Sequence, residues 1–216
     1  MEFSVFLSQL ASGMLRSVLI FFLTLLFSLP LGLVVALLRR SGIKIIEWIM
    51  KIYISIVRGT PLMLQLFVVY FAPYYVFGIK LSPNYRVYAT IIGFSINYAA
   101  YFAEIYRGGI ESISVGQYEA CEVLGYSKLQ TFFRIILPQV IKRILPSITN
   151  EIVTLVKDKS LAFTVSYQEM FTIGKQIANS QTSFVPFIVA GVFYYVFNAV
   201  VDYGMGKAEN ALNYYR

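Results

Sequence analysis

Residues 114–138 read SVGQYEACEVLGYSKLQTFFRIILP, and they form a charged island between apolar segments. Ser114 and Gln117 have the spacing of a capping box, which predicts the start of a short helix. Gly125 follows an apolar residue and is typical of the position just beyond a helix C-terminus. The sequence therefore predicts one short, capped helix between residues 114 and 125.

The chain beyond this helix repeats the same capping pattern. Ser127 and Gln130 have capping-box spacing, so a second helix begins after only a glycine turn. Two helices joined so tightly cannot be collinear. We expect the short helix to lie across a membrane surface, where it serves as a docking element for another protein.

The composition places the rest of the chain in a membrane. Of 216 residues, 58% are hydrophobic and 13% are charged, and the mean hydropathy is +0.68. Several apolar segments approach the roughly 20 residues that a helix needs to cross a bilayer. We predict an all-α, multi-pass membrane protein whose residues 1–216 form a single transmembrane domain. The first apolar segment is too long for a signal peptide and is predicted to be a retained span.

Five spans are predicted, and the second is interrupted. Gly59, Thr60 and Pro61 combine a helix stop with a new helix start, so residues 62–77 are expected to continue the span after a break. An amphipathic helix is expected near residues 168–178, between the last two spans. An odd number of spans places the two termini on opposite sides of the membrane. The predicted spans are residues 18–38, 43–57 with 62–77, 87–106, 132–156 and 184–201.

Missing residue types exclude most enzyme classes. The sequence has no histidine and only one cysteine, which argues against Cys/His metal sites and histidine-dependent nucleophiles. No Walker A sequence is present, so any ATP-derived energy must come from a partner. The net charge of +7 is spread over loops and span ends, which argues for membrane topology and against nucleic-acid binding.

The island resembles the EAA loop of ABC importer permeases. The match is Glu119-Ala120-Cys121, three residues, Gly125, nine residues and then Ile135-x-Leu137-Pro138. Cys121 stands where the family usually has a second alanine. Two further segments resemble the polar amino acid branch of that family, and the resemblance covers nearly the whole chain. These segments are Arg58-Gly59-Thr60-Pro61 and Ala103-Glu104-Ile105-x-Arg107-Gly108-Gly109-Ile110.

The resemblance implies a set of partners. It implies two ATPase subunits, which bind the ATP and magnesium while this chain holds no cofactor, and an external amino acid binding protein. A second permease subunit is expected, giving a homodimer or a heterodimer. The island would be cytoplasmic in a bacterial plasma membrane, with Met1 outside and Arg216 inside. The residues expected to couple to the ATPase are Gln117, Glu119, Ala120, Cys121, Glu122, Leu124 and Gly125. Alternatively, the two glutamates only solvate the island.

Glu104 and Arg107 are the first candidates for substrate binding, because ionisable groups within spans are costly and are functional candidates by default. Their spacing also allows an ordinary ion pair within one helix. The sharper hypothesis is a zwitterion clamp, in which the carboxylate meets the ammonium of an amino acid and the guanidinium meets its carboxylate. Both interpretations remain open.

Asp202 is the candidate that would select a cationic side chain. It ends an otherwise apolar span and has no basic neighbour at helical spacing. The alternative is a helix-end residue that is solvated by the cytoplasm. Gln65 and Asn97 are neutral, and they either bind substrate or hold spans together by hydrogen bonds.

A third group of candidates surrounds the two predicted helix breaks. Residues 157–161 resemble the family's Lys-x-x-Ser-Leu segment, where freed backbone groups can line a cavity and bind a substrate carboxylate. The candidates in this group are Met63, Lys159, Ser160 and Leu161. Tyr98 and Tyr101 are candidates from the third span, because they lie on or near the polar stripe that Asn97, Tyr101 and Glu104 form there. The tyrosines are alternatively part of the aromatic belt or of the core.

Together these features predict the membrane-spanning subunit of an ATP-driven importer. Its expected substrate is a polar, cationic amino acid such as arginine, lysine or histidine, moved by alternating access. The alternative is the same class of importer carrying glutamine or another polar amino acid. An intramembrane enzyme and a passive channel are the least favoured hypotheses.

Overall fold

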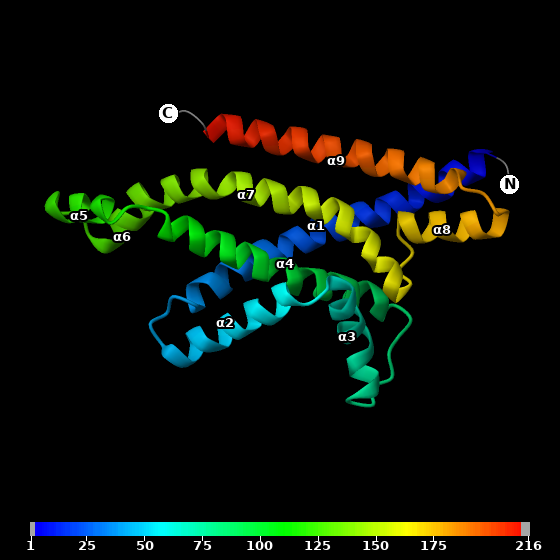
Figure 1. The fold of residues 1–216 in the computed structure, drawn as a ribbon, viewed down its shortest axis with the longest axis horizontal. Coiled ribbons are helices and arrows are strands. Elements are labelled where there is room, and N and C mark those ends of the chain that lie inside the picture. Colours follow the sequence, from blue (N-terminus) through cyan, green and yellow to red (C-terminus); the bar gives the residue numbers. More distant parts are fainter. Residues whose placement is uncertain (1–2, 213–216) are drawn as a thin grey trace.

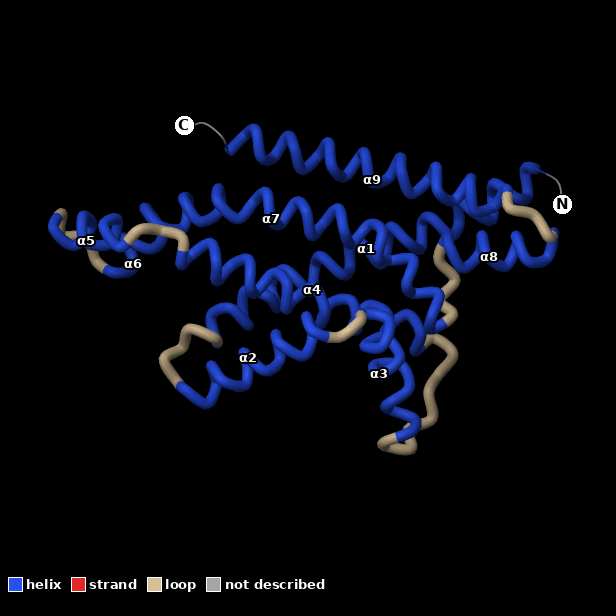
Figure 2. Tube along the Cα trace, in the orientation of Figure 1, coloured by secondary structure: helices blue, strands red, loops and turns tan. Residues whose placement is uncertain are grey.

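The protein is helical throughout the part that the structure describes. A computed structural model describes residues 3–212, and this part contains no strand (Figures 1 and 2). The prediction of an all-α fold is therefore confirmed. The elements are α1 (Phe3–Leu38), α2 (Lys44–Gly59), α3 (Leu62–Tyr75), α4 (Tyr85–Glu111), α5 (Val115–Val123), α6 (Lys128–Gln130), the π-helix η1 (Thr131–Ile136), α7 (Leu137–Asp158), the 3₁₀-helix η2 (Lys159–Val165), α8 (Met170–Gln181) and α9 (Val185–Leu212).

Four long helices run along the longest axis of the molecule. These are α1, α4, α7 and α9, and α4 lies between α1 and α7 (Figure 1). The N-terminal end of α1 lies beside α8 at one end of the bundle, whereas α5 and α6 project from the other end. The C-terminal end of α9 points toward the α5 end, so the described chain begins and finishes at opposite ends.

Hydropathy separates the helices into two kinds. Ser4–Leu38 and Val185–Leu212 are long and apolar enough to span a membrane, with mean hydropathies of 2.7 and 1.7, and α2 with α3 qualifies as a bent pair. The helices α4 and α7 are long enough but carry more polar residues. Many of the polar groups of α4 face other helices, where Ser95 and Asn97 are buried. A helix in the middle of a bundle can carry such groups because it is shielded from lipid.

The first helix begins much earlier than the predicted start of the span at residue 18. Phe6 and Leu10 are buried in a cluster with Met170, Ile177 and Ala190, which come from α8 and α9. This packing extends α1 through residues 3–17, whose hydrophobic content alone did not predict a span. The predicted helix between the last two spans is present as α8, a few residues later than expected.

The second predicted span is broken at the expected place, but it does not continue in the same direction. The helices α2 and α3 are bent by 111° at the break, so α3 turns away from the axis of α2 (Figure 1). The side chain of Gln65 closes this corner. Its Nε2 atom donates hydrogen bonds to the carbonyl oxygens of Val57 at 2.7 Å and Thr60 at 3.0 Å, and its Oε1 atom accepts one from Asn97 at 3.0 Å.

Replacing Gln65 with leucine is expected to destabilise the protein by about 1–3 kcal/mol, because buried Asn97 and the freed carbonyl groups at the corner would lose their partner. Thermal unfolding of the purified protein in detergent measures this change. Gln65→Glu keeps the acceptor for Asn97 and is the matched comparison. An unchanged midpoint for the leucine variant would show that the corner does not depend on Gln65.

The island contains two helices, as predicted, but only one of the two capping boxes forms. Ser127 and Gln130 make both reciprocal hydrogen bonds of the box. Ser114 occupies the N-cap of α5 with extended backbone angles, but its side chain makes no capping hydrogen bond. The prediction for Ser114 was wrong because both groups of Gln117 are engaged elsewhere. Its amide donates to the carbonyl oxygen of Ser114 at 3.0 Å and not to the hydroxyl, and its Oε1 atom accepts a hydrogen bond from Gln139 of α7 at 3.3 Å.

Gly125 ends α5 in the predicted way. Its φ is +74°, a left-handed conformation that residues with a Cβ atom rarely adopt. The amide of Tyr126 donates to the carbonyl oxygen of Cys121 at 3.0 Å, as in a Schellman motif. Cys121 is buried.

Candidate functional site

Helices α4 and α7 meet along an antiparallel seam. The hydroxyl of Tyr98 on α4 donates a hydrogen bond to Oδ2 of Asp158 at the C-terminal end of α7, at 2.8 Å. At the α5 end of the same seam, the guanidinium of Arg143 donates to the carbonyl oxygen of Ser112. Between these two contacts, Gly109 lies against Ile144, where an added Cβ atom would be only 2.1 Å from the isoleucine side chain.

Charged and aromatic groups gather beside the half of this seam that lies farther from α5. The guanidinium of Arg58, at the end of α2, lies 5.3 Å from the ring centroid of Tyr101 on α4. Glu151 of α7 interacts electrostatically with both Arg58 and Asp158. We call Arg58, Tyr98, Tyr101, Glu151 and Asp158 the polar cluster.

The chemistry of the polar cluster suits a zwitterionic ligand that carries an extra positive charge. Two carboxylates attract cations, one guanidinium can bind a carboxylate, and the ring of Tyr101 offers a surface for cation–π contact. Within the cluster the carboxylates outnumber the guanidinium, and this negative excess is offset by the ammonium of exposed Lys157, which interacts electrostatically with Asp158. Such an excess is costly within a membrane unless a cation is supplied.

Only part of this cluster was found from the sequence. Tyr98 and Tyr101 were predicted, whereas Arg58, Glu151 and Asp158 were not assigned to the site. The available signals were the position of Arg58 directly before the predicted helix break and the seven-residue spacing of the two carboxylates, which places both on one helical face. The sequence did not show that α4 packs against α7, and this packing brings the residues of the cluster together.

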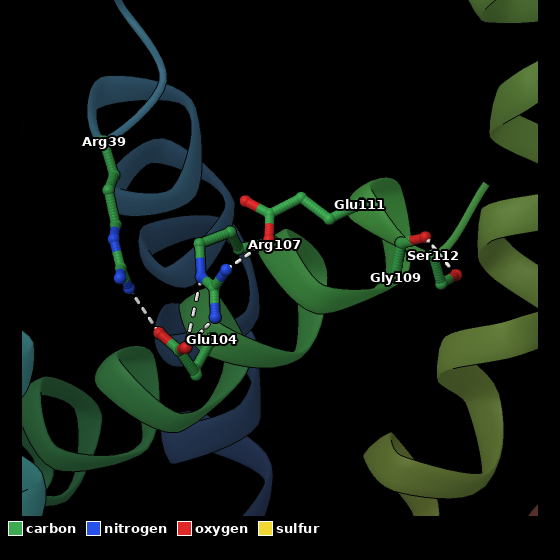
Figure 3. Close-up of polar contacts among 6 residues, drawn as sticks. All are labelled: Arg39, Glu104, Arg107, Gly109, Glu111 and Ser112. Carbon is green, nitrogen blue, oxygen red and sulfur yellow. Dashed lines mark hydrogen bonds and ion pairs between the residues drawn. The ribbon is translucent and has the colours of Figure 1, made fainter. Parts of the chain in front are cut away.

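Glu104 and Arg107 form an ion pair that also includes Arg39 and Glu111 (Figure 3). The carboxylate of Glu104 accepts hydrogen bonds from Arg39 at the end of α1 and from Arg107 on its own helix. This matches the simpler interpretation of an internal ion pair and ties α1 to α4. A zwitterion clamp would require these ion pairs to open.

The remaining predicted residues lie in separate places. Met63 is half-buried near the start of α3, and Leu161 packs at the edge of the main core cluster. The hydroxyl of Ser160 donates to the carbonyl oxygen of Lys157 at 2.9 Å. Asp202 is exposed on α9, a helix that contributes no residue to the polar cluster. Among residues 3–212 it makes no ion pair.

Lys159 points away from the polar cluster. Its side chain is fully buried, and its Nζ atom lies 4.2 Å from the ring centroid of Phe197 on α9 and 5.0 Å from that of Phe21 on α1. Asp158, the preceding residue, faces Tyr98 on α4 instead. The side chains of the consecutive residues Asp158 and Lys159 therefore contact different helices.

A buried carboxylate that sequence reasoning missed joins three helices at the start of α8. Glu169 caps α8 by accepting hydrogen bonds from the amides of Phe171 and Thr172 at 2.8 and 2.7 Å. It also accepts from the hydroxyl groups of Tyr194 on α9 at 2.7 Å and Ser17 on α1 at 3.3 Å. These contacts satisfy the carboxylate and give it a structural role in holding α1, α8 and α9 together.

The island, at the end of the bundle opposite α8 (Figure 1), is exposed on nearly all sides. Every residue from 114 to 130 is exposed except Cys121, and Val123 and Leu124 show 88% and 73% of their surface. Glu119 and Glu122 lie on the same short helix as these apolar side chains. A protruding helix with mixed apolar and acidic side chains is typical of a surface that binds another protein.

Comparison with known sequences identifies the family. A model of the family described as "Binding-protein-dependent transport system inner membrane component" matches residues 28–212. The chain belongs to this family. It is therefore the permease subunit of an ABC importer for polar amino acids, and ATPase activity resides in a partner subunit.

Individual relatives agree with this assignment. The permease is 35% identical over 190 residues to the "Probable amino-acid permease protein YxeN" of Bacillus subtilis, covering 88% of this chain and 84% of that protein. It is 32% identical to the "L-cystine transport system permease protein TcyB" (95% and 87% covered) and 32% identical to the "Arginine transport system permease protein ArtQ" (96% and 95% covered), both of the same organism.

A solved structure matches the fold as well. It is described as "Crystal structure of an amino acid ABC transporter with histidines", and it is 28% identical to the permease with a TM-score of 0.87. The match covers 98% of this chain and 99% of that one. The predictions of family, fold class and non-enzymatic role are confirmed: the permease is an amino acid importer subunit of the bacterial cell membrane, and it works with an ATPase and a binding protein.

Proposed function

We propose that the permease carries cationic amino acids, and that the polar cluster binds them. The observation that supports this proposal is the negative excess of the cluster, where Glu151 interacts with the single guanidinium of Arg58 and Asp158 is balanced by exposed Lys157 outside the cluster. A substrate with a guanidinium or ammonium side chain would take the place of Lys157 beside Asp158. Its α-carboxylate would then pair with Arg58.

A neutral amino acid such as glutamine is the second candidate. It has the same ammonium and carboxylate as arginine, but its uncharged side chain could not replace Lys157 beside Asp158. The names of the relatives do not decide between a cationic and a neutral substrate, since ArtQ is named for arginine and TcyB for cystine. Charge balance in the cluster is therefore the reason for preferring the cationic class.

The assembly that we propose has two permeases and two ATPase subunits. Each ATPase would bind ATP with magnesium, while the permease itself holds no cofactor. The α5 helix would dock on the ATPase through its exposed apolar and acidic side chains, which places the α5 end and Arg216 in the cytoplasm and Met1 outside. Rocking of the two permeases, passed through the short Gly125 turn, would alternate the access of the polar cluster.

Competition binding tests the choice of substrate. Labelled arginine is bound to the purified permease–ATPase complex, and unlabelled lysine, histidine and glutamine compete. We expect lysine to displace arginine at least about tenfold more effectively than glutamine does, since a hydrogen-bonded charge pair contributes about 1.5–3 kcal/mol. Equal or better displacement by glutamine would move the assignment to neutral substrates.

The other predicted residues stay in the proposal as secondary candidates. Asp202 is tested in the same assay through Asp202→Asn. Glu104 and Arg107 are proposed to act only if Arg39 releases the carboxylate. The clamp hypothesis therefore predicts that Arg39→Gln strengthens substrate binding, and the ion-pair interpretation predicts that it does not.

A further inference from the structure

A pocket lies on the seam between α4 and α7, nearer to α5 than the polar cluster is. It encloses about 430 Å³, with Ile105, Gly108 and Ser112 from α4 on one side and Arg143 and Ser147 from α7 on the other. A free amino acid fits easily within such a volume. None of these residues belongs to the polar cluster.

Two adjacent glycines give the pocket its shape. At Gly109 the helices touch, because a Cβ atom there would meet Ile144 at 2.1 Å. At Gly108 a Cβ atom would meet nothing within 4 Å, so this glycine borders open space. Figure 3 shows Gly109 and Ser112 on the side of α4 that faces α7. The contact therefore closes one side of the pocket, while Gly108 leaves the other side wide.

The pocket continues the line of the polar cluster. Ser147 lies one helical turn from Glu151, and Arg143 lies one further turn toward α5. On α4, Ile105 and Gly108 follow Tyr101 at helical spacing in the same direction. Eight residues of helix separate Glu151 from Arg143, which is about 12 Å of axial distance. A molecule that leaves the cluster toward the α5 end would reach Arg143 next.

Arg143 has the free binding capacity that this position requires. Its side chain is exposed, and the one hydrogen bond that the structure gives its guanidinium within residues 3–212 goes to the carbonyl oxygen of Ser112. Arg107, by contrast, has its donors taken by Glu104 and Glu111. A guanidinium with open donors recognises a carboxylate in bidentate geometry.

We propose that this pocket is a second binding site for the transported amino acid, occupied on the way to the α5 side, in which Arg143 binds the α-carboxylate. The proposal rests on the proposed function of the polar cluster. The carboxylate is common to all amino acids, so this site does not select among side chains. It receives the substrate when the cluster releases it.

Two variants test the site through different groups. Arg143→Gln removes the charge, and Gly108→Leu adds a bulky side chain at the edge of the pocket, where nothing lies within 4 Å of the Cβ position. The matched controls are Arg134→Gln, an exposed arginine outside the pocket, and Gly191→Leu, a glycine of α9 that also has open space. Leucine favours a helix over glycine, so the leucine variants are expected to fold.

Equilibrium binding of labelled arginine to the purified permease–ATPase complex is the measurement. We expect two classes of site per permease in the unmodified protein. Arg143→Gln and Gly108→Leu should each weaken the lower-affinity class at least about tenfold and change the other class by less than about twofold. Both controls should retain both classes.

The outcomes separate this proposal from the function it rests on. A single class in the unmodified protein, or a second class that survives both variants, would overturn the second site and leave the polar cluster intact. The loss of the higher-affinity class in Arg143→Gln would also overturn it, since Arg143 would then belong to the first site. If neither class is sensitive to Asp158→Asn, the proposed role of the polar cluster fails.

Discussion

Asp158→Asn is expected to weaken arginine binding at least about tenfold, because it removes one of the two negative charges that a cationic substrate would neutralise. Asparagine retains an oxygen that can accept the hydrogen bond from Tyr98, which is 2.8 Å long in the native protein. The α4–α7 contact should therefore persist while the charge is lost. Equilibrium binding to the purified permease–ATPase complex measures the effect, and thermal unfolding checks the fold.

Three comparisons make this prediction specific. Glu151→Gln should weaken arginine binding in the same way, because its carboxylate shares the negative excess. Asp202→Asn should change arginine binding by less than about twofold if the polar cluster alone supplies the charge. Glutamine binding should respond less to all three changes. If arginine binding responds to Asp202→Asn and ignores Asp158→Asn, the site has been placed on the wrong helices.

The second large effect is expected at α5. The double variant Glu119→Arg, Gly125→Val should reduce ATP-driven uptake at least about tenfold, since 1.4 kcal/mol of lost coupling free energy corresponds to one factor of ten. Valine is disfavoured at φ +74° by about 1–2 kcal/mol, which disturbs the turn that carries α5. The charge reversal at exposed Glu119 opposes docking of a surface that accepts an acidic helix.

Substrate binding and thermal stability separate a coupling defect from misfolding in this variant. The island lies at the end of the bundle opposite α8 (Figure 1), so amino acid binding at the polar cluster should stay within about twofold of the native value. Lys128→Gln changes a charge on the same island and should retain uptake. Normal uptake by the double variant would show that α5 does not transmit the ATPase motion.

The sequence predicts best those features that depend on one residue and its neighbours. Gly125 marks the end of α5 because its backbone conformation excludes most other residues, and this requirement is local. Pro61 marks the break between α2 and α3 through an equally local property, because its ring fixes φ and it has no N–H that could continue α2. The angle of 111° at that break was not predictable, because Gln65 ties the corner together by donating to the carbonyl oxygens of Val57 and Thr60 and by accepting from Asn97 on another helix.

The polar cluster shows where sequence reasoning stops. Tyr98 and Tyr101 were candidates because they lie near a polar stripe, but the pairing of Tyr98 with Asp158 joins residues 60 positions apart. Lys159 was a candidate as an extra basic residue beside a helix break. Its side chain packs against Phe21 and Phe197, on other helices, because successive residues of any helix point about 100–120° apart.

The capping residues give a smaller example of the same limit. Ser114 and Gln117 have the spacing of a capping box, but Gln139 of α7 engages the glutamine side chain. Ser127 and Gln130 have the same spacing and form the box, since no other element competes for them. Spacing predicts which hydrogen bonds are possible, and the packing of distant helices decides which of them form.

ATP-driven uptake by reconstituted proteoliposomes tests the central claim most directly. The permease, its ATPase and its binding protein are reconstituted together, and labelled arginine is followed with ATP and with a non-hydrolysable analogue. We predict accumulation against a gradient with ATP only, and its loss when the binding protein is omitted. Accumulation without ATP hydrolysis, or ATP-driven uptake of glutamine but not of arginine, would contradict the account.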